Sequence, residues 1–392
     1  MKELGEIAAA WRVAEQAGEE AILATVVEVQ GSSYRRPGGR MLLTSTGRRR
    51  GAISGGCLEG DLAKKAWWLT AEGRAAIRTY DTAADADGPA DFGLGCNGLI
   101  HVLIERLRPG HAALPVIAIE QSRATRRKAG LATVIRSQDA SLVGRHAAVL
   151  PGPANQAGPA SLAEPVAHSE WELWLEDQAA EALKSGRSEV VRRGEDAGYL
   201  EAFVETIEPP LHLLLFGGGD DALAVANQAK LLGWRLTVLD GRRDHARADR
   251  FPNADAVVVN SLDDPLSGVA LDEWTIAVVM THSFSQDAAA LRELARHKLT
   301  YAGILGPQRR TERLIETAGL AGGKLPAEWY SPAGLDLGGD TPEQVALAIV
   351  AEAHGVLEGR GTPGHLRDRG GPIHSAAEER SERPFANSIV CA

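Results

Sequence analysis

The fold of the C-terminal half is decided by one stretch, Leu213-Leu214-Leu215-Phe216-Gly217-Gly218-Gly219-Asp220-Asp221-Ala222. It fits the pattern G-x-G-x-x-A, with an apolar strand before the glycines and a helical pattern after them. Asp240 ends the next apolar run, at the place where a carboxylate accepts the ribose hydroxyls of a dinucleotide. The free N–H groups at the helix N-terminus favour phosphate. The stretch therefore predicts a Rossmann fold.

Whether this turn binds a nucleotide stays open. Asp220 sits where a phosphate would lie and would repel it, unless the side chain caps the helix instead. A second interpretation is a Rossmann fold that is retained without nucleotide binding.

Around this stretch, short apolar strands alternate with helices, which is typical of a parallel sheet covered on both faces. Strands are expected at 211–216, 235–240, 256–260, 275–281 and 301–305, and helices at 221–232, 287–297, 309–318 and 342–358. Ligands of such sheets bind at the carboxyl ends of the strands. The candidate contacts there are Gly217, Gly219, Asp240, His282 and Arg309, with Arg310 beside the last. For His282 the alternatives are a ligand contact, a base or a structural residue. For the two arginines they are a clamp for an anion or the exposed start of a helix.

Two glycine-rich segments mark a second candidate site near the N-terminus, at 31–40 and 54–60. Glycine lets a ligand approach the backbone closely, and arginine offers a planar fork of donors to phosphate or carboxylate. The candidate cofactor contacts are Arg35, Arg36, Ser54, Gly55, Gly56, Cys57 and Glu59. The alternative is a pair of turns with solvated arginines.

Cys57 and Cys96 each lie among glycines, and neither has a CxxC or CxxH partner, so a zinc site is weakly supported. Soft thiolates do suit a soft metal or transferable sulfur, which makes both cysteines candidate metal ligands. The alternative is that each is a small buried hydrophobe. Glu59 is placed to orient a ligand, or to raise the pKa of Cys57 if it is close and charged.

The residues before 208 predict an α+β domain. Helices are expected at 3–17, 61–71 and 171–185, and strands at 21–30, 40–45, 51–54, 75–81, 99–105, 116–120, 131–136, 147–150 and 199–205. The prolines at Pro209 and Pro210 cannot join a central ladder and mark a boundary. We expect an N-terminal α+β domain over 1–208 (core motifs 1–108, extension 109–208), a Rossmann-like doubly wound domain over 209–360 and a flexible tail over 361–392.

Composition narrows the class of protein. The 392 residues carry a formal net charge of −10, which argues against general nucleic-acid binding. Three cysteines cannot form a disulfide framework, so a reducing compartment, the cytoplasm, is expected. We find no signal-peptide pattern and no apolar run of the roughly 20 residues that a membrane span needs.

Both glycine-rich segments resemble the XdhC/CoxI family, the accessory factors of xanthine dehydrogenase and related molybdenum hydroxylases. The resemblance extends to Phe92-Gly93-Leu94-Gly95-Cys96-Asn97-Gly98, to the segment from Leu211 and to residues 334–343, and so covers most of the chain. Two residues depart from the family pattern. Asn97 replaces the first of two glycines after the second cysteine, and Asp220 stands where the family often has a histidine.

The resemblance implies a maturation factor rather than an enzyme. Such a protein binds and shields the molybdenum cofactor, for which the resemblance makes Cys57 and Cys96 the candidate molybdenum ligands. It also supports sulfuration of the cofactor by a cysteine desulfurase and delivers it to a xanthine-dehydrogenase-like apoenzyme. It also implies a homodimer, and it makes the phosphate end of molybdopterin, or of its dinucleotide form, an alternative ligand of the Rossmann turn. The other hypotheses are an NAD(P)-dependent oxidoreductase that uses the C-terminal domain, for which His282 is the candidate proton relay, and a scaffold without cofactor.

Overall fold

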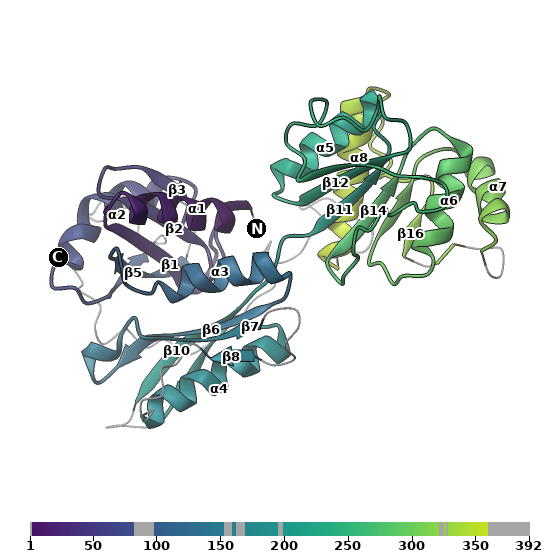
Figure 1. The fold of residues 1–392 in the computed structure, drawn as a ribbon. Coiled ribbons are helices and arrows are strands. Elements are labelled where there is room, and N and C mark those ends of the chain that lie inside the picture. The colour runs from purple at the N-terminus through teal and green to yellow at the C-terminus, as the bar shows by residue number, and fades with distance from the viewer. Residues whose placement is uncertain are drawn as a thin grey trace. The chain divides into compact units, whose positions relative to one another are not determined.

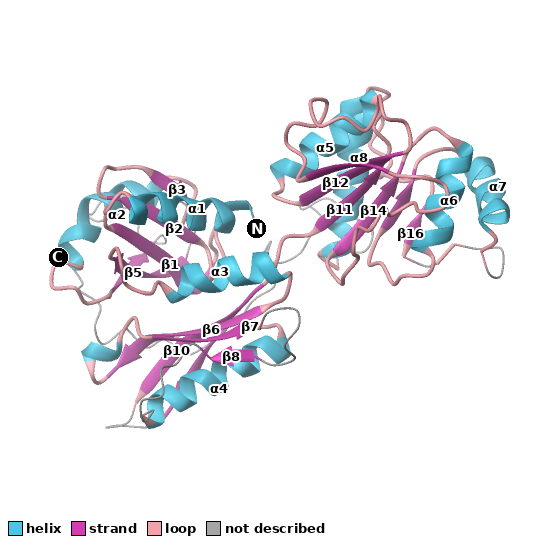
Figure 2. Cartoon of the chain, viewed as in Figure 1, coloured by secondary structure: helices cyan, strands magenta, loops and turns pink. Residues whose placement is uncertain are grey.

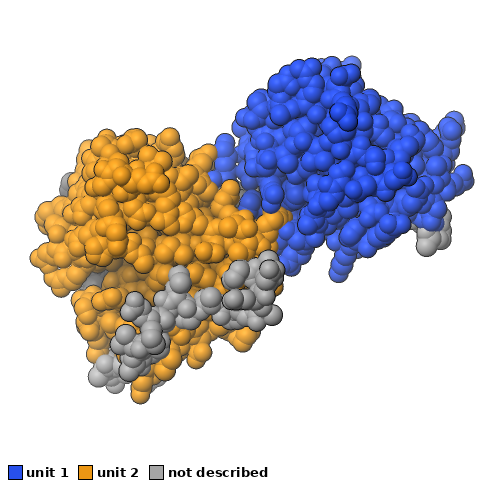
Figure 3. Space-filling view, in the orientation of Figure 1, with its two compact units in different colours: residues 1–2, 210–369 blue, residues 3–209, 370–392 orange. Residues whose placement is uncertain are grey.

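The computed structural model describes residues 2–81, 98–152, 159–161, 169–194, 199–320, 325–326 and 328–359. The chain divides into two compact units, one mainly of residues 3–209 and one mainly of residues 210–369 (Figure 3). Each unit is described below by itself. Among the described residues, no helix combines the length and the apolar character that crossing a bilayer requires.

The first unit contains two antiparallel five-stranded sheets (Figure 1). The first sheet has the strand order β3-β2-β1-β5-β4, and the second has the order β8-β7-β6-β10-β9. The strands of the first are β1 (Ala21–Gly31), β2 (Arg40–Thr44), β3 (Arg49–Gly51), β4 (Ala76–Asp81) and β5 (Gly98–Leu107). Those of the second are β6 (Ala129–Ser137), β7 (His146–Pro151), β8 (Pro159–Ser161), β9 (Glu189–Arg193) and β10 (Leu200–Ile207).

Four helices complete this unit: α1 (Lys2–Gln16), α2 (Cys57–Leu69), α3 (Leu114–Thr125) and α4 (Glu170–Ser185), with a short 3₁₀ turn at Ala140–Leu142. Side chains alternate along β1, so its two faces enter different cores. Ile22 packs on the α2 side, whereas Leu23 packs with α1 and α3. Helix α4 packs on the second sheet.

The strand expected at 116–120 was wrong, because these residues belong to helix α3. Pro115 stands in the first turn of that helix, where its missing N–H costs nothing. Val116, Ile119 and Ser122 are buried at a spacing of three residues, which is helical. A short apolar run fits a strand and a helix equally well until the packing partner is known.

The second unit is a six-stranded parallel sheet with helices on both faces (Figure 2). Its strands are β11 (His212–Phe216), β12 (Arg235–Asp240), β13 (Ala256–Val259), β14 (Thr275–Val279), β15 (Ala302–Ile304) and β16 (Trp329–Tyr330). Its helices are α5 (Asp220–Leu231), α6 (Phe284–Leu294), α7 (Gln308–Ala318) and α8 (Pro342–Leu357). The Rossmann-like fold is confirmed.

The strand order of this sheet is β13-β12-β11-β14-β15-β16, in which β11 lies between the two halves. This is the 3-2-1-4-5-6 order of dinucleotide-binding domains, and the order reverses between β11 and β14. Helices α5 and α8 share one core on one face, and α6 and α7 share another on the opposite face. A ligand crevice is therefore expected where β11 and β14 end.

Candidate functional site

The N-terminal site is built where β3 leads into helix α2. The helix begins at Cys57, four residues earlier than the sequence pattern indicated, so the thiol stands in its first turn. The Cys57 residue is exposed and is not in a disulfide. Gly56 precedes it with φ of 122°, a conformation that other residues rarely adopt.

Glu59 anchors this loop from inside. It is 1% exposed and accepts hydrogen bonds from the backbone N–H groups of Ile53 (3.0 Å) and Ser54 (2.8 Å) and from the Ser54 hydroxyl (2.6 Å). Burial alone would raise the pKa of Glu59, but these hydrogen bonds bring it below its ordinary value. The Glu59 carboxylate thus holds the Ser54 loop in place.

A hollow of about 260 Å³ opens in front of this loop. Its lining residues are Tyr34, Arg35, Arg49, Gly51, Ala52, Ser54, Gly55, Gly56 and Glu59. Arg35 is oriented by an ion pair with Glu3 of α1, with a 2.9 Å distance between Nη1 and Oε2. The structure thus brings together Arg35, Ser54, Gly55, Gly56 and Glu59 of the sequence-predicted set. Arg36 and Cys57 are exposed, and neither lines the hollow.

Four residues of the hollow were not predicted as contacts: Tyr34, Arg49, Gly51 and Ala52. Arg49 follows the β2–β3 turn and lines the hollow, which the cluster Arg48–Arg50 could have signalled. Gly51 has φ of 77°, and an added Cβ would lie 2.3 Å from the Arg40 carbonyl oxygen. The hollow therefore combines cationic donors with a backbone that only glycine permits.

The second thiol, Cys96, lies outside the described residues. Gly98, two residues later in the sequence, pairs with Gly31 in the β1–β5 ladder. Within the described part of the chain, no group of three or more His, Cys, Asp and Glu side chains is placed to hold a metal ion.

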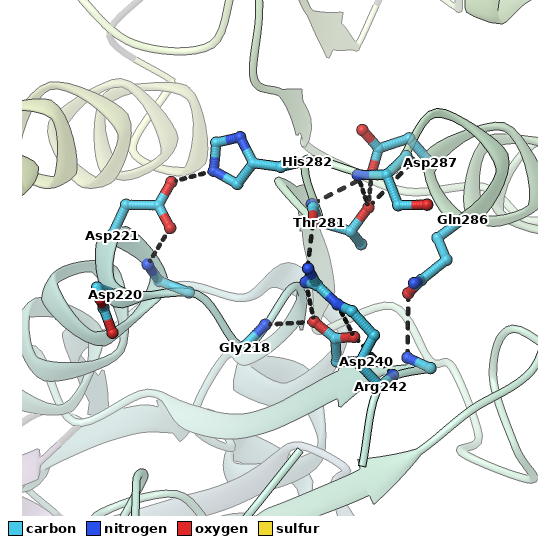
Figure 4. A network of polar contacts seen from close by, with 12 residues as sticks. Gly218, Asp220, Asp221, Asp240, Arg242, Thr281, His282, Gln286 and Asp287 are labelled. Carbon is cyan, nitrogen blue, oxygen red and sulfur yellow. Dashed lines mark hydrogen bonds and ion pairs between the residues drawn. The ribbon is translucent and has the colours of Figure 1, made fainter. Parts of the chain in front are cut away.

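The second site is the carboxyl edge of the Rossmann sheet, where polar side chains follow β11, β12 and β14 (Figure 4). Gly217 and Gly218 are needed for packing, because an added Cβ would lie 2.5 Å from the carbonyl oxygen of Met280 or of His245. Over Gly219, the Asp221 carboxylate occupies the space, at 2.7 Å from such a Cβ.

Asp240 turns inward at this edge. It is fully buried, and its carboxylate accepts hydrogen bonds from the Gly218 N–H (2.9 Å) and from the Arg242 backbone (2.8 Å) and guanidinium. Burial alone would raise the pKa of Asp240, but the hydrogen bonds from Arg242 and Gly218 lower it. The carboxylate thereby joins the glycine turn to Arg242.

Asp221 and His282 face each other across the glycine turn (Figure 4), with 2.6 Å between Oδ2 and Nε2. An ionised carboxylate only accepts, so the Nε2 atom carries the proton in this pair. His282 has φ of 59°, and its side chain is 59% exposed. A non-glycine residue in this conformation is uncommon and marks a constrained position.

The remaining residues predicted for this edge have different surroundings. Asp220 is exposed at the start of α5 and forms an ion pair with Arg250 (2.7 Å). Arg309 is exposed, whereas its neighbour Arg310 donates to the buried Asp287 (2.6 Å). Arg242 and Asp287 were missed, and the position of Arg242 two residues after Asp240 was the available signal.

Known proteins resemble this chain along most of its length. A family model described as the XdhC Rossmann domain matches residues 213–353, and one described as the XdhC and CoxI family matches residues 14–81. A protein of Bacillus subtilis, named as a probable subunit of xanthine dehydrogenase, is 31% identical, over 85% of this chain and 92% of its own length.

Two further comparisons agree. The molybdenum cofactor insertion chaperone PaoD of Escherichia coli is 32% identical over 29% of this chain and 34% of its own. A crystal structure described as a xanthine dehydrogenase from Bacillus halodurans is 26% identical, with a TM-score of 0.71, over 93% of this chain and 98% of that one.

Proposed function

Because this chain belongs to the XdhC and CoxI family, we propose that it binds the molybdenum cofactor and helps to mature a xanthine-dehydrogenase-like molybdenum hydroxylase. The relative named as a molybdenum cofactor insertion chaperone supports the cofactor as cargo. The observation that carries the proposal is the N-terminal hollow, which arginines and glycine backbone line, with the exposed Cys57 directly after the lining residue Gly56 in the sequence.

The residues of the hollow suit such a cargo. Arg35 and Arg49 offer N–H donors to the phosphate of the pterin, and an exposed thiol is the soft ligand that molybdenum accepts. Cys57 also stands in the first turn of helix α2, directly after Gly56. Glu59 and Ser54 keep the loop in one conformation, so that the ligand does not have to order it.

We also propose the finer steps that the family resemblance implies: shielding of the cofactor, support of its sulfuration by a cysteine desulfurase, delivery to the apoenzyme, a homodimeric state and a cytoplasmic location. Cys96 is proposed as the second thiol of the site. Pull-down of a purified desulfurase and of a xanthine-dehydrogenase-like apoenzyme tests the two partners separately, and light scattering tests the homodimer.

The cofactor proposal is tested with protein purified from molybdenum-replete cells. We expect Cys57→Ser and Arg49→Ala each to lower bound molybdenum and pterin several-fold, because each removes a contact with the cargo. Molybdenum is measured by elemental mass spectrometry and the pterin by its fluorescence after oxidation.

Two control variants match these changes. Cys391→Ser removes a thiol of the C-terminal tail, and Arg50→Ala removes the neighbouring arginine, which does not line the hollow. Both should retain the content of the wild type. Unchanged molybdenum in Cys57→Ser and Arg49→Ala would exclude the hollow as the cofactor site.

An NAD(P)-dependent oxidoreductase is the second candidate, and the strand order of the Rossmann sheet favours it. The inward-turned Asp240 speaks against it, because a carboxylate with four internal hydrogen bonds has no lone pair left for ribose. Nicotinamide found in the small molecules that co-purify with the protein would favour the oxidoreductase.

A further inference from the structure

The carboxyl edge of the Rossmann sheet has an arrangement in which buried aspartates hold arginines from behind. Each oxygen of Asp240 accepts two hydrogen bonds: Oδ1 from the backbone N–H and Nε of Arg242, and Oδ2 from Gly218 and from Nη2 of Arg242. This exhausts the acceptor sites of a carboxylate. The carboxylate that would bind a ribose hydroxyl in this fold therefore has all its acceptor sites filled by hydrogen bonds within the protein.

Arg242 is the side chain that Asp240 holds. Its Nη2 also donates to the Thr281 carbonyl oxygen (2.9 Å), so the guanidinium bridges the ends of β12 and β14. Arginine has five N–H donors, and among the described residues these contacts leave the two on Nη1. The side chain is 37% exposed, whereas that of Asp240 is buried. The guanidinium is thus partly exposed, with its Nη1 donors outside these contacts, at the point where the strand order reverses.

Arg310, in helix α7, is held by a buried aspartate in the same way. Asp287 is 1% exposed; its Oδ2 accepts from Arg310 (2.6 Å), and its Oδ1 accepts from the Thr281 hydroxyl (2.5 Å) and N–H (3.2 Å). Thr281 therefore connects both arginines. Arg242 bonds to the carbonyl oxygen of Thr281, and Asp287 accepts from the hydroxyl and N–H of the same residue, so Arg242, Asp287 and Arg310 form one network.

We propose that this edge binds the phosphate group of a ligand through Arg242 and Arg310, and that Asp240 aims Arg242 instead of reading a ribose. The ligand class is a phosphate ester, as in a nucleotide or a phosphorylated pterin. Arginine suits it because its planar fork matches phosphate oxygens. This inference does not depend on the function proposed for the N-terminal hollow.

The binding test uses the full chain, inorganic pyrophosphate and ADP as probes, and isothermal titration. Arg242→Gln and Arg310→Gln should each weaken both probes about tenfold or more, since each removes charged donors to the phosphate. Arg243→Gln and Arg309→Gln are matched controls, because these neighbours are exposed and bond to no residue in the described part of the chain. They should bind as the wild type does.

Folding is checked by the thermal unfolding midpoint of each variant, and Arg242→Lys, which keeps the charge, replaces any variant that does not fold. Absence of pyrophosphate binding to the wild type at millimolar concentration would overturn the site. Equal losses in the control variants would also overturn it, because the effect would then come from surface charge alone.

The role of Asp240 is tested by removing the ribose hydroxyl that an acidic residue at this position would bind. ADP and 2′-deoxy-ADP should bind within about twofold of each other, and a tenfold weaker 2′-deoxy-ADP would overturn the proposal. Asp240→Asn should weaken pyrophosphate in the wild-type background but not in Arg242→Gln. An equal effect in both backgrounds would show that Asp240 acts independently of Arg242.

The source of the phosphate is found by mass spectrometry of the small molecules that co-purify with the protein. Nucleotides and oxidised pterins are separated, and the wild type is compared with the Arg242→Gln/Arg310→Gln double variant. A phosphorylated molecule of either class that is lost in the double variant supports the site. Its full retention in the double variant contradicts the site.

Discussion

At the scale of single residues, the buried carboxylates of this protein hold other groups in position. Glu59 fixes the Ser54 loop, Asp240 fixes Arg242, and Asp287 fixes Arg310. In each case a carboxylate oxygen that could accept from a ligand accepts instead from a donor of the protein. The arginines that the aspartates hold, Arg242 and Arg310, are the candidate ligand contacts, rather than the carboxylates themselves.

The acid dependence of stability follows from Asp240. Its pKa is lowered in the folded protein, so its contribution is complete above the ordinary aspartate value of 3.8 and is lost as the pH falls further. Asp240→Asn places amide hydrogens against N–H donors and should cost about 1–3 kcal/mol at pH 7. The difference from the wild type should shrink below about pH 4.

Urea unfolding followed by circular dichroism between pH 3 and pH 7 measures this difference. Asp263→Asn, at an exposed position, is the control and should follow the wild type at every pH. A difference that stays constant across the range would mean that the Asp240 charge does not contribute.

At the scale of elements, buried ion pairs connect the two sheets of the first unit. Arg40 of β2 bonds to Glu205 of β10, and the two side chains are 2% and 6% exposed. Arg136 of β6 likewise bonds to Glu28 of β1 (2.6 Å) and to Glu201 of β10. The charged groups thus bridge strands of different sheets, where an isolated charge would be costly.

Removal of one partner of such a pair should therefore lower the free energy of unfolding strongly. We expect Arg40→Ala to lower the free energy of unfolding by about 3–5 kcal/mol, since it leaves Glu205 buried without its cation. Arg48→Ala on the neighbouring turn breaks an exposed pair with Glu19 and should cost less than about 1 kcal/mol.

Chemical denaturation of both variants and of Arg40→Leu/Glu205→Leu measures these values. The double variant should recover much of the loss, because two apolar side chains leave no buried charge. An Arg40→Ala protein as stable as Arg48→Ala would show that the pair does not hold the sheets together.

At the scale of the whole molecule, the apolar cores follow the division into two units. Among the described residues, the apolar clusters of the second unit consist of residues between 211 and 357, and those of the first consist of residues between 4 and 207. Pro209 and Pro210 lie at the division. We propose that each unit folds as a separate domain.

A fragment of residues 209–360 should unfold cooperatively in urea, with a midpoint close to one of two transitions of the full chain. The physical reason is that a core confined to one unit gains little from the other. A fragment of residues 1–208 should account for the second transition. A single coincident transition in the full chain, with both fragments unfolded, would contradict separate domains.

The sequence by itself determined the elements whose signals are local. Apolar runs, the glycine turn after Phe216 and the following helix are sufficient for the Rossmann fold, because strand, turn and helix patterns need only nearby residues. The same holds for the glycine-rich segments that bring Arg35 and Ser54 to one hollow.

Only the tertiary structure decided what depends on distant partners. Whether residues 114–125 form a helix or a strand depended on the core they entered, and the short apolar run carried no such information. The direction of Asp240 depended on Gly218 and Arg242, and the inward contact of Arg310 depended on Asp287. A side chain turns toward the partners that satisfy it, and those partners come together only when the chain has folded.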